Sequence, residues 1–146
     1  MLRLATAADL PRLRDLMADY YAEVGYPFDP AAARDCFGAI VRDPALGRVW
    51  MVEAGGDVAG YAVLAFGYSL EHRGKDAFVD DLYVVPARRG RGLGRAALEA
   101  VEAAARELGV RALHLEVERE NASAQALYLD RGFRDTDRRL MTKRLG

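Results

Sequence analysis

Apolar residues recur every three or four positions in several stretches of the chain, a spacing that predicts helices with one buried face. The first stretch covers residues 10–20 and follows a capping arrangement at Thr6 and Asp9. The second covers residues 30–42 and follows Asp29, a typical helix N-cap. We therefore expect two successive helices near the N-terminus.

Two further helical stretches lie in the second half of the chain. Residues 96–108 place Val101 and its helical neighbours on one apolar face, and Gly109 follows as a stop signal. Residues 121–130 form a shorter stretch that carries Tyr128. The periodicity thus predicts two more helices.

Shorter apolar or alternating stretches predict strands. The turn Gly55-Gly56-Asp57 is typical of a hairpin between two of them, and residues 69–75 are expected to form a polar loop. The element order is then β-α-α-β-β-β-α-β-α-β-β, in one domain that covers residues 1–146. The predicted strands cover residues 2–5, 48–54, 58–68, 78–85 and 112–117, a return strand that starts at Gly132-Phe133, and residues 140–143.

The chain is organised around residues 78–108, where a buried strand, a glycine-rich basic turn and a helix follow one another. The glycines at positions 90, 92 and 94 let backbone N–H groups point inward, since no Cβ is in the way. The first turn of the helix adds unpaired N–H donors and the positive end of its dipole. Arginines at positions 88, 89, 91 and 95 add charge. This arrangement predicts a phosphate site; the alternative is a solvated basic loop with a tight turn.

Two common phosphate motifs do not fit this turn. A dinucleotide motif, G-x-G-x-x-G, would need glycine where the chain has Arg95, and a P-loop would need Lys-Ser or Lys-Thr after the glycines. The pattern that fits is R-x-x-G-x-G at Arg89, Gly92 and Gly94. It resembles the acyl-CoA pyrophosphate loop of the GNAT superfamily of N-acetyltransferases, and the preceding D-L-Y-V-V-P, residues 81–86, resembles that family's fourth strand.

A second pattern extends the resemblance toward the C-terminus. Asn121 is followed seven residues later by Tyr128 and then by Gly132-Phe133, as in the part of the GNAT family that follows the fifth strand. The resemblance implies the GNAT fold, an α/β (α+β) arrangement. It has a mixed, mostly antiparallel central sheet of about seven strands, flanked by four helices.

The resemblance also implies that acetyl-CoA is the co-substrate. In the family, backbone N–H groups of the fourth strand bond the thioester carbonyl and the pantetheine amides. The Asn after the fifth strand contacts the pantetheine arm, and the Tyr on the following helix lies near the CoA sulfur. The matching residues of this chain are Leu82, Tyr83, Val84, Arg89, Gly90, Arg91, Gly92, Leu93, Gly94, Arg95, Asn121 and Tyr128.

Asp80 and Asp81 are carboxylates in a strand that we expect to be buried on both faces, which is costly unless they are paired. Neighbouring strand residues point to opposite faces, so the two are not expected to share one role. Asp80 shares a face with Leu82 and Val84 and matches the family's usual Glu, a general base that often acts through water. The alternatives are a salt bridge at the edge of the core or an anion that binds the substrate. With residues 82–84, the pair looks most like the diamine acetyltransferase branch.

Tyr128 is the predicted proton donor. A tyrosine side chain has a reference pKa of about 10 and is protonated at pH 7. Direct attack of an amine on the thioester expels a CoA thiolate, which needs a proton. The alternative is an ordinary core aromatic on a short helix.

The resemblance places the acceptor pocket around the first helix, the loop that follows it and the loop after the third strand. Aromatic and acidic side chains there would suit a cationic amine. Asp80, Asp81 and Glu71 are expected to lie together near the end of the central groove. The alternatives are core packing for the tyrosines and a solvated loop for the rest. The candidates are Tyr20, Tyr21, Tyr26, Phe28, Tyr68, Glu71 and His72, together with Asp80 and Asp81.

Composition narrows the class of protein. The 146 residues are 51% hydrophobic and 29% charged, with a formal net charge of −1, whereas a nucleic-acid-binding domain is usually strongly basic. The single Cys36 excludes an internal disulfide and suits a reducing compartment. No apolar run is long enough to span a membrane, and residues 1–10 do not resemble a signal peptide. We therefore expect a cytoplasmic protein with no membrane or nucleic-acid partner.

The sequence thus predicts an acetyl-CoA-dependent N-acetyltransferase in which both substrates bind together and the amine of a cationic small molecule or peptide attacks the thioester directly. The alternative is a non-catalytic, regulatory acyl-CoA-binding module. A generic nucleotide-phosphate binder fits less well, because neither glycine motif matches. His72, His114 and Cys36 are scattered along the chain, so no metal site is expected. Dimers are common in the family, so a homodimer is one option for its assembly.

Overall fold

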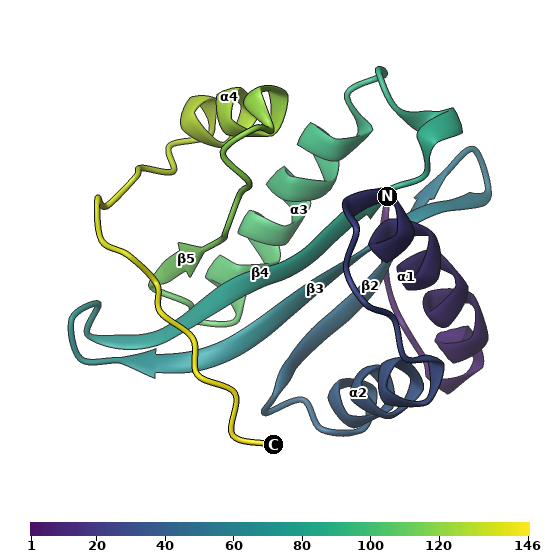
Figure 1. Ribbon diagram of the computed structural model, residues 1–146, viewed down its shortest axis with the longest axis horizontal. Coiled ribbons are helices and arrows are strands. Elements are labelled where there is room, and N and C mark those ends of the chain that lie inside the picture. The colour runs from purple at the N-terminus through teal and green to yellow at the C-terminus, as the bar shows by residue number, and fades with distance from the viewer. The chain divides into compact units, whose positions relative to one another are not determined.

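The computed structural model describes residues 1–146. The chain forms two compact units, Met1–Leu115 and Glu116–Gly146. The first unit holds a five-stranded sheet and three α-helices (Figure 1), and the second holds one α-helix. The single domain over the whole chain stays a prediction.

The sheet runs in the order β1-β2-β3-β4-β5, so each strand pairs with its neighbour in the sequence. All pairs are antiparallel except β4 and β5, which are parallel. A mixed, mostly antiparallel sheet with flanking helices is therefore confirmed. The strands are β1 Leu2–Leu4, β2 Gly47–Ala54, β3 Asp57–Ser69, β4 Gly74–Val84 and β5 Ala112–His114.

The α-helices lie where the apolar periodicity predicts them, and both predicted caps are confirmed. The Asp9 carboxylate accepts a hydrogen bond from the backbone N–H of Thr6 at 2.8 Å. The Asp29 side chain accepts from two backbone N–H groups in the first turn of the next helix. The helices are α1 Leu10–Val24, α2 Pro30–Arg42, α3 Leu93–Glu107 and α4 Ala122–Asp130, with short 3-10 turns at Ala7–Asp9 and Pro86–Arg88.

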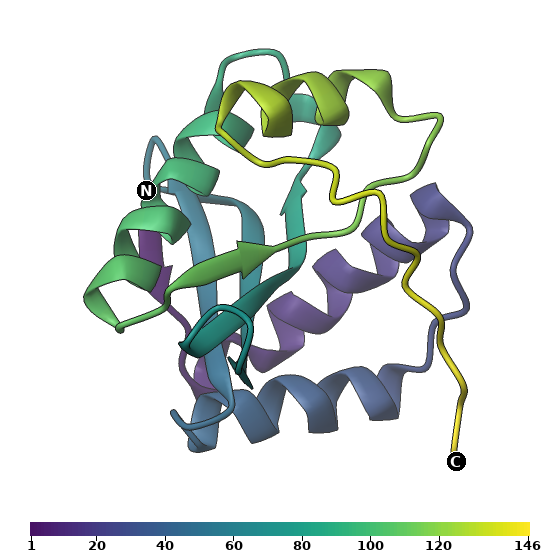
Figure 2. The ribbon, with the colours of Figure 1, turned by 90° about the vertical axis from the view of Figure 1, so that its left-hand side faces the viewer.

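Apolar side chains fill both faces of the sheet. Figure 2 shows α1 and α2 on one side of the strands and α3 on the other. Leu16 of α1, Phe37 of α2 and Tyr61 of β3 belong to one buried cluster, while Leu98 and Val101 of α3 are fully buried. Each such side chain stabilises the fold by about 1.5–3 kcal/mol. The sheet and the two helix layers therefore give β4 a fixed position.

The hairpin between β3 and β4 is tighter than predicted. The polar loop expected at residues 69–75 is wrong, because only residues 70–73 turn between the strands. The polar side chains that suggested a loop have partners in the ladder. The Lys75 ammonium lies 4.5 Å from the centre of the Phe66 ring, and the Asp76 carboxylate pairs with a histidine of β5. Lys75 and Asp76 therefore belong to β4, because each of these polar side chains has a favourable partner.

The last two predicted strands, at Gly132-Phe133 and at residues 140–143, do not form, so the sheet has five strands instead of about seven. Every residue between 134 and 139 is polar or charged, so this stretch offers no apolar face to bury. Asp137 has a φ of 55°, a left-handed conformation that interrupts extended backbone. Residues 133–146 therefore add no strand to the sheet.

β5 is also shorter than the predicted 112–117. Its three residues pair with residues 76–78 of β4, and the ladder stops there. A β-bulge follows in β4: Asp81 pairs with Val63 and Val79 pairs with Leu64, so Asp80 is an extra residue. A bulge bends its strand and disrupts the ladder locally, which explains the early end of β5.

Gly60 of β3 generates a prediction about this packing. A Cβ at Gly60 would clash with the backbone carbonyl oxygen of Tyr83. Because backbone cannot move aside as a flexible side chain does, Gly60→Ala should lower the free energy of unfolding in urea by about 1–3 kcal/mol. Gly94→Ala is the control, since no heavy atom lies within 4 Å of its Cβ position. Equal stability of the two variants would contradict the close approach of β3 and β4.

Candidate active site

One carboxyl group, that of Asp81, lies partly buried in the middle of β4. The Tyr61 hydroxyl donates a hydrogen bond to Asp81 Oδ2 at 2.8 Å. Burial raises the pKa of Asp81 from 3.8 to about 7; the hydrogen bond from Tyr61 opposes the rise and the charge of Asp80 adds to it. Burial raises the pKa of Tyr61 as well, so this phenol keeps its proton and acts as the donor. Asp81 can therefore gain or lose a proton near neutral pH.

Asp80 is exposed, as is Phe78, so the prediction that this strand is buried on both faces is wrong. Burial is the main cause that raises the pKa of Tyr21, and the charges of both Asp81 and Asp80 add to the rise, so both carboxylates act on one phenol. If side chains alternated strictly along β4, those of Asp80 and Asp81 would point to opposite faces of the sheet. The bulge at Asp80 explains the difference, because it breaks the alternation.

Aromatic side chains of α1, of the loop after it and of β4 gather beside Asp81. The Tyr20 ring stacks on the Tyr83 ring at 5.2 Å between centroids. The Tyr21 ring contacts the rings of Tyr26 and Phe28 edge-on, at 5.5 and 6.3 Å. Four of the predicted acceptor residues, those on α1 and the following loop, are thus brought together.

Tyr21 connects this aromatic cluster to the carboxylates. Burial is the main cause that raises its pKa to about 12, and the charges of Asp81 and Asp80 follow as causes. Two carboxylates bordered by aromatic rings form a surface that attracts a cation. The arrangement can hold an ammonium group and take up a proton from it.

The glycine-rich turn adopts the backbone conformation that its sequence predicts. Gly90 and Gly92 have φ angles of 79° and 75°, and Gly92 is the N-cap of α3. Gly94 has no such angle, and no heavy atom lies within 4 Å of the position of an added Cβ. A helical glycine costs about 0.5–1 kcal/mol relative to alanine. Since the packing of the chain does not require Gly94, the open space beside it suits a bound molecule.

Two of the four arginines around this turn are held by acidic side chains. Arg88 Nη2 lies 2.9 Å from Asp57 Oδ2. Arg89 donates to both carboxylate oxygens of Glu23, at 2.6 and 2.8 Å. Arg91 and Arg95 are exposed. Part of the positive charge of the turn is therefore used in structural contacts.

Tyr68 and Glu71 do not join the carboxylates. Tyr68 is 79% exposed near the end of β3, and Glu71 lies in the turn that follows. Asp80 lies six positions after Gly74 along β4, roughly 20 Å at about 3.3 Å per residue. The prediction that Glu71 clusters with Asp80 and Asp81 is therefore wrong.

His72 and His114, which are far apart in the sequence, meet at the outer end of the β3–β4 hairpin. Their ring centroids are 5.2 Å apart, and His114 Nε2 lies 2.9 Å from Asp76 Oδ2. The hairpin brings one histidine beside β5, which carries the other. No group of three or more His, Cys, Asp or Glu side chains is placed so that it could hold a metal ion.

The second unit carries the remaining predicted residues on or beside α4. Asn121 is its N-cap, and the Asn121 Oδ1 accepts a hydrogen bond from the backbone N–H of Ala124 at 3.2 Å. Tyr128 packs edge-on against Phe133 at 5.9 Å. Burial raises the pKa of Tyr128, which strengthens its hold on the phenolic proton.

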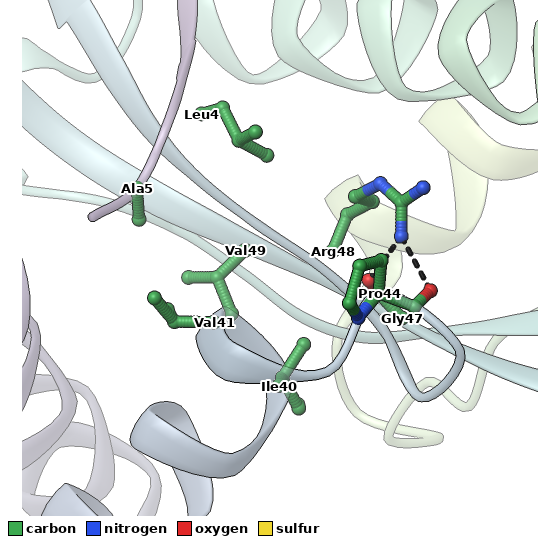
Figure 3. Close-up of a pocket in the computed structure, with 8 residues that line it drawn as sticks. All are labelled: Leu4, Ala5, Ile40, Val41, Pro44, Gly47, Arg48 and Val49. Carbon is green, nitrogen blue, oxygen red and sulfur yellow. Dashed lines mark hydrogen bonds between the residues drawn. The ribbon is translucent and has the colours of Figure 1, made fainter. Parts of the chain in front are cut away.

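A surface pocket of about 260 Å³ lies elsewhere in the first unit, beside the end of α2 and the start of β2 (Figure 3). Arg48 Nη1 donates to the carbonyl oxygens of Pro44 and Gly47, at 2.6 and 2.7 Å. None of the predicted site residues lines this pocket. Its lining consists of Leu4, Ala5, Ile40, Val41, Pro44, Gly47, Arg48 and Val49.

Comparison with known proteins identifies the family. Residues 10–133 match the acetyltransferase (GNAT) family. The chain belongs to this family. The GNAT fold predicted from the glycine turn and the element order is therefore confirmed, with five strands in the sheet.

Individual GNAT relatives agree with this result. The uncharacterized N-acetyltransferase YycN of Bacillus subtilis (strain 168) is 40% identical over 75 residues, which are 51% of this chain and 47% of that protein. The chain thus matches about half the length of that relative.

None of the helices of this GNAT protein is long and apolar enough to cross a membrane.

Two solved structures resemble the whole chain. An integron cassette protein from the mobile metagenome of Cole Harbour Salt Marsh has a TM-score of 0.88 and 39% identity, and the match covers 99% of this chain and 90% of that one. A predicted acetyltransferase from Clostridium acetobutylicum, solved with acetyl-CoA, has a TM-score of 0.82 and 19% identity. That match covers 98% of this chain and 95% of the other, and it concerns the fold alone.

Sequence reasoning about this GNAT chain missed Tyr61 and Glu23. Tyr61 lies two residues before Val63, the partner of Asp81, so it is the diagonal neighbour of the carboxylate. The signal was a single hydroxyl within the apolar stretch of residues 58–67. Glu23 lies in the last turn of α1, where the helix dipole disfavours a negative charge, and this position hinted at a partner.

The raised pKa of Asp81 predicts how stability depends on pH. Below about pH 4 the carboxyl is protonated in both the folded and the unfolded chain, so its burial carries no charge penalty. As pH rises from about 4 to about 7 only the unfolded chain ionises, so the free energy of unfolding should fall by roughly 2–4 kcal/mol from this group. Asp81→Asn should flatten this part of the curve, measured by urea unfolding at several pH values. Parallel curves for both proteins would contradict the raised pKa.

Proposed function

We propose that the protein transfers the acetyl group of acetyl-CoA to a primary amine of a cationic acceptor, by direct attack of the amine while both substrates are bound. The observation that carries the proposal is the Asp81 carboxyl, which lies beside the tyrosine cluster in the strand that leads into the glycine turn. Membership of the acetyltransferase (GNAT) family supports the reaction class.

The glycine turn and the N-terminus of α3 are the proposed site for the CoA pyrophosphate. Gly90 and Gly92 have positive φ angles on either side of Arg91, and backbone that alternates in this way turns successive N–H groups toward one point, as in the nests that bind anions. Gly94 leaves open space beside the first turn of the helix, and Arg91 and Arg95 add positive charge. The Clostridium acetobutylicum protein, which shares the fold, was solved with acetyl-CoA, and this supports acetyl-CoA as the ligand.

The thioester end of the same substrate is assigned to the backbone of β4. N–H groups of Leu82, Tyr83 and Val84 would bond the thioester carbonyl and the pantetheine amides, and donors fixed in a strand stabilise a developing oxyanion. The Asn121 amide nitrogen has two N–H donors that its helix cap does not use. These donors suit the pantetheine arm.

The acceptor amine would bind as an ammonium ion beside Asp81 and Asp80, against the rings of Tyr21, Tyr26 and Phe28. A lysine-like amine has a pKa of about 10.4, so removing its proton at pH 7 costs about 4.6 kcal/mol. Asp81, with a pKa of about 7, is a better proton acceptor than an ordinary aspartate. Asp80 is exposed and suits the role of an anchor for the ammonium ion or for a bridging water.

In the proposed step the amine nitrogen forms a bond to the acetyl carbon, and the C–S bond of the thioester breaks. The bound ammonium ion first gives one proton to Asp81, directly or through water. Once the nitrogen has bonded to the acetyl carbon it carries a second surplus proton, which passes to water and replaces the proton that Tyr128 gives up. Tyr128 gives a proton to the departing thiolate; its part rests on the sequence pattern that begins at Asn121. The raised pKa of Tyr128 keeps it protonated at pH 7 before the step.

The proposed acceptor is a small cationic amine. Residues 80–84 favour a diamine or another small cationic amine, and a peptide amine is the next class. The single Cys36 supports work in the reducing cytoplasm. A homodimer remains a prediction.

A thiol-release assay tests the proposed function. The full chain is mixed with acetyl-CoA and a panel of diamines, amino acids, peptides, and neutral and anionic amines. We expect amine-dependent release of CoA, with the highest kcat/KM for a cationic acceptor. Binding of CoA in calorimetry without release for any amine would support the non-catalytic acyl-CoA-binding module instead.

Gly94→Val tests the pyrophosphate site. A Cβ at this position has open space around it, so the variant should fold, but the valine methyl groups would occupy the space assigned to the ligand. The Kd for CoA should rise at least about tenfold, a loss of about 1.4 kcal/mol. Ala103→Val, which is exposed on the same helix, is the control and should bind as wild type. An unchanged Kd in folded Gly94→Val would contradict the assignment.

Tyr128→Phe tests the proton donor. The variant loses one hydroxyl group, so kcat should fall by about 10²–10⁴-fold, the usual contribution of general acid catalysis. The Kd for acetyl-CoA should stay within about twofold, because the aromatic ring is retained. A kcat close to that of the wild type would return Tyr128 to a packing role.

A further inference from the structure

Glu23 and Arg89 join the end of α1 to the start of the glycine turn. Arg89 donates from Nη1 and Nη2 to the two carboxylate oxygens of Glu23, and its Nε donates to the carbonyl oxygen of Val84 at 2.9 Å. The guanidinium also lies 5.6 Å from the centre of the Tyr83 ring. Each of its three nitrogens therefore bonds to another part of the protein.

The position of Glu23 indicates that the Glu23–Arg89 ion pair does not stabilise α1 itself. An acidic side chain in the last turn of a helix is disfavoured by the helix dipole. The side chains of Glu23 and Arg89 are 41% and 42% exposed, and pairs as exposed as this contribute little to stability. The bidentate geometry instead fixes the orientation of the guanidinium.

The same contacts connect the turn to the aromatic cluster. Tyr83 lies beneath Arg89 and stacks on Tyr20, which is on α1 one turn before Glu23. Arg89 is thus held by α1 through the ion pair and through the two stacked rings. Gly90, the first glycine of the turn, follows Arg89 directly.

We infer that Glu23 is a positioning residue. Its carboxylate fixes the Arg89 side chain, and Arg89 in turn fixes the position of the glycine turn; we call this Glu23–Arg89 pair the strut. The phosphates are bound by backbone N–H groups and by the other basic side chains of the turn. This inference rests on the proposed function, since it concerns the CoA site. It assigns Arg89 an indirect part in CoA binding, in place of the direct phosphate contact that the sequence motif implies. The Glu23–Arg89 pair also couples the glycine turn to α1, the helix that carries Tyr20 and Tyr21 of the proposed acceptor site.

The opposite arrangement makes an opposite prediction. If Arg89 bound the pyrophosphate, Glu23 would compete with the phosphates for the guanidinium, and removing its charge would tighten CoA binding. In the strut arrangement the removal of Glu23 leaves Arg89 unfixed and weakens CoA binding. The sign of the change therefore separates the two.

The experiment measures the Kd for CoA by calorimetry with the full chain. Glu23→Gln and Arg89→Gln should each raise the Kd by about tenfold, equivalent to about 1.4 kcal/mol. The double variant should be no weaker than either single variant, because both changes remove the same strut. Asp57→Asn is the matched control: it breaks the ion pair of the neighbouring Arg88 and should change the Kd by less than twofold.

The Kd of Arg89→Lys for CoA distinguishes the strut from a general loss of structure. Lysine keeps the charge but cannot reproduce the bidentate fork or the Nε bond to Val84. A strut predicts that Arg89→Lys binds CoA as weakly as Arg89→Gln, with the salt dependence of Kd unchanged from wild type. A direct phosphate contact predicts partial rescue by Lys and a weaker salt dependence in Arg89→Gln.

Three results would overturn the inference: tighter or unchanged CoA binding in Glu23→Gln, additive losses in the double variant, or rescue by Arg89→Lys. Circular dichroism of each variant checks that it is folded, and Glu23→Asp is the substitute if Glu23→Gln unfolds, since its shorter side chain also breaks the bidentate pair. A wild-type chain that binds no CoA would instead refute the proposed function, and with it the inference.

Discussion

The proposed acceptor side of this protein depends on one hydrogen bond, from the Tyr61 hydroxyl to the Asp81 carboxylate. A partly buried carboxylate in a central strand costs free energy unless a donor meets it, and the register of β3 against β4 makes Tyr61 the donor. The bond offsets part of the cost but not all of it, so the pKa of Asp81 stays raised near neutrality. The same face is bordered by the tyrosines of α1 and the loop after it, and the chemistry available there is an acidic group among aromatic rings.

β4 also links this face to the glycine turn. The strand bulges at Asp80, carries Asp81 and Tyr83, and then leads through a short 3-10 turn to Gly90 and α3. Because the strand is held between two neighbours and two layers of helices, the carboxylate and the turn have fixed positions relative to each other. The contacts of Arg89 with Glu23, Val84 and Tyr83 add a second connection between the turn and α1. The proposed cofactor site and the proposed acceptor site thus lie along one strand, as transfer between two bound substrates requires.

Local signals predicted much of this fold, and the errors came from contacts between distant segments. Caps, the Gly55-Gly56 turn and the glycine turn each depend on a few adjacent residues, so the sequence was enough. The bulge at Asp80 depends on the register of β3 against β4, which no local pattern records, and it undermined the assignment of the two carboxylates by alternation. Tyr61 was missed for the same reason. Lys75 and Asp76 look like loop residues until their partners are known, and the length of the hairpin then separates Glu71 from Asp80. The expected strands at the C-terminus had too few apolar positions to form.

The most direct test of the Tyr61–Asp81 pair is a titration of the Asp81 carboxyl carbon by ¹³C NMR in the free protein. The structure predicts a midpoint near pH 7, because burial opposes ionisation. In Tyr61→Phe the midpoint should move higher still, since the hydrogen bond that favours the ionised form is lost. A midpoint near the ordinary value of about 4, the same in both proteins, would contradict the account.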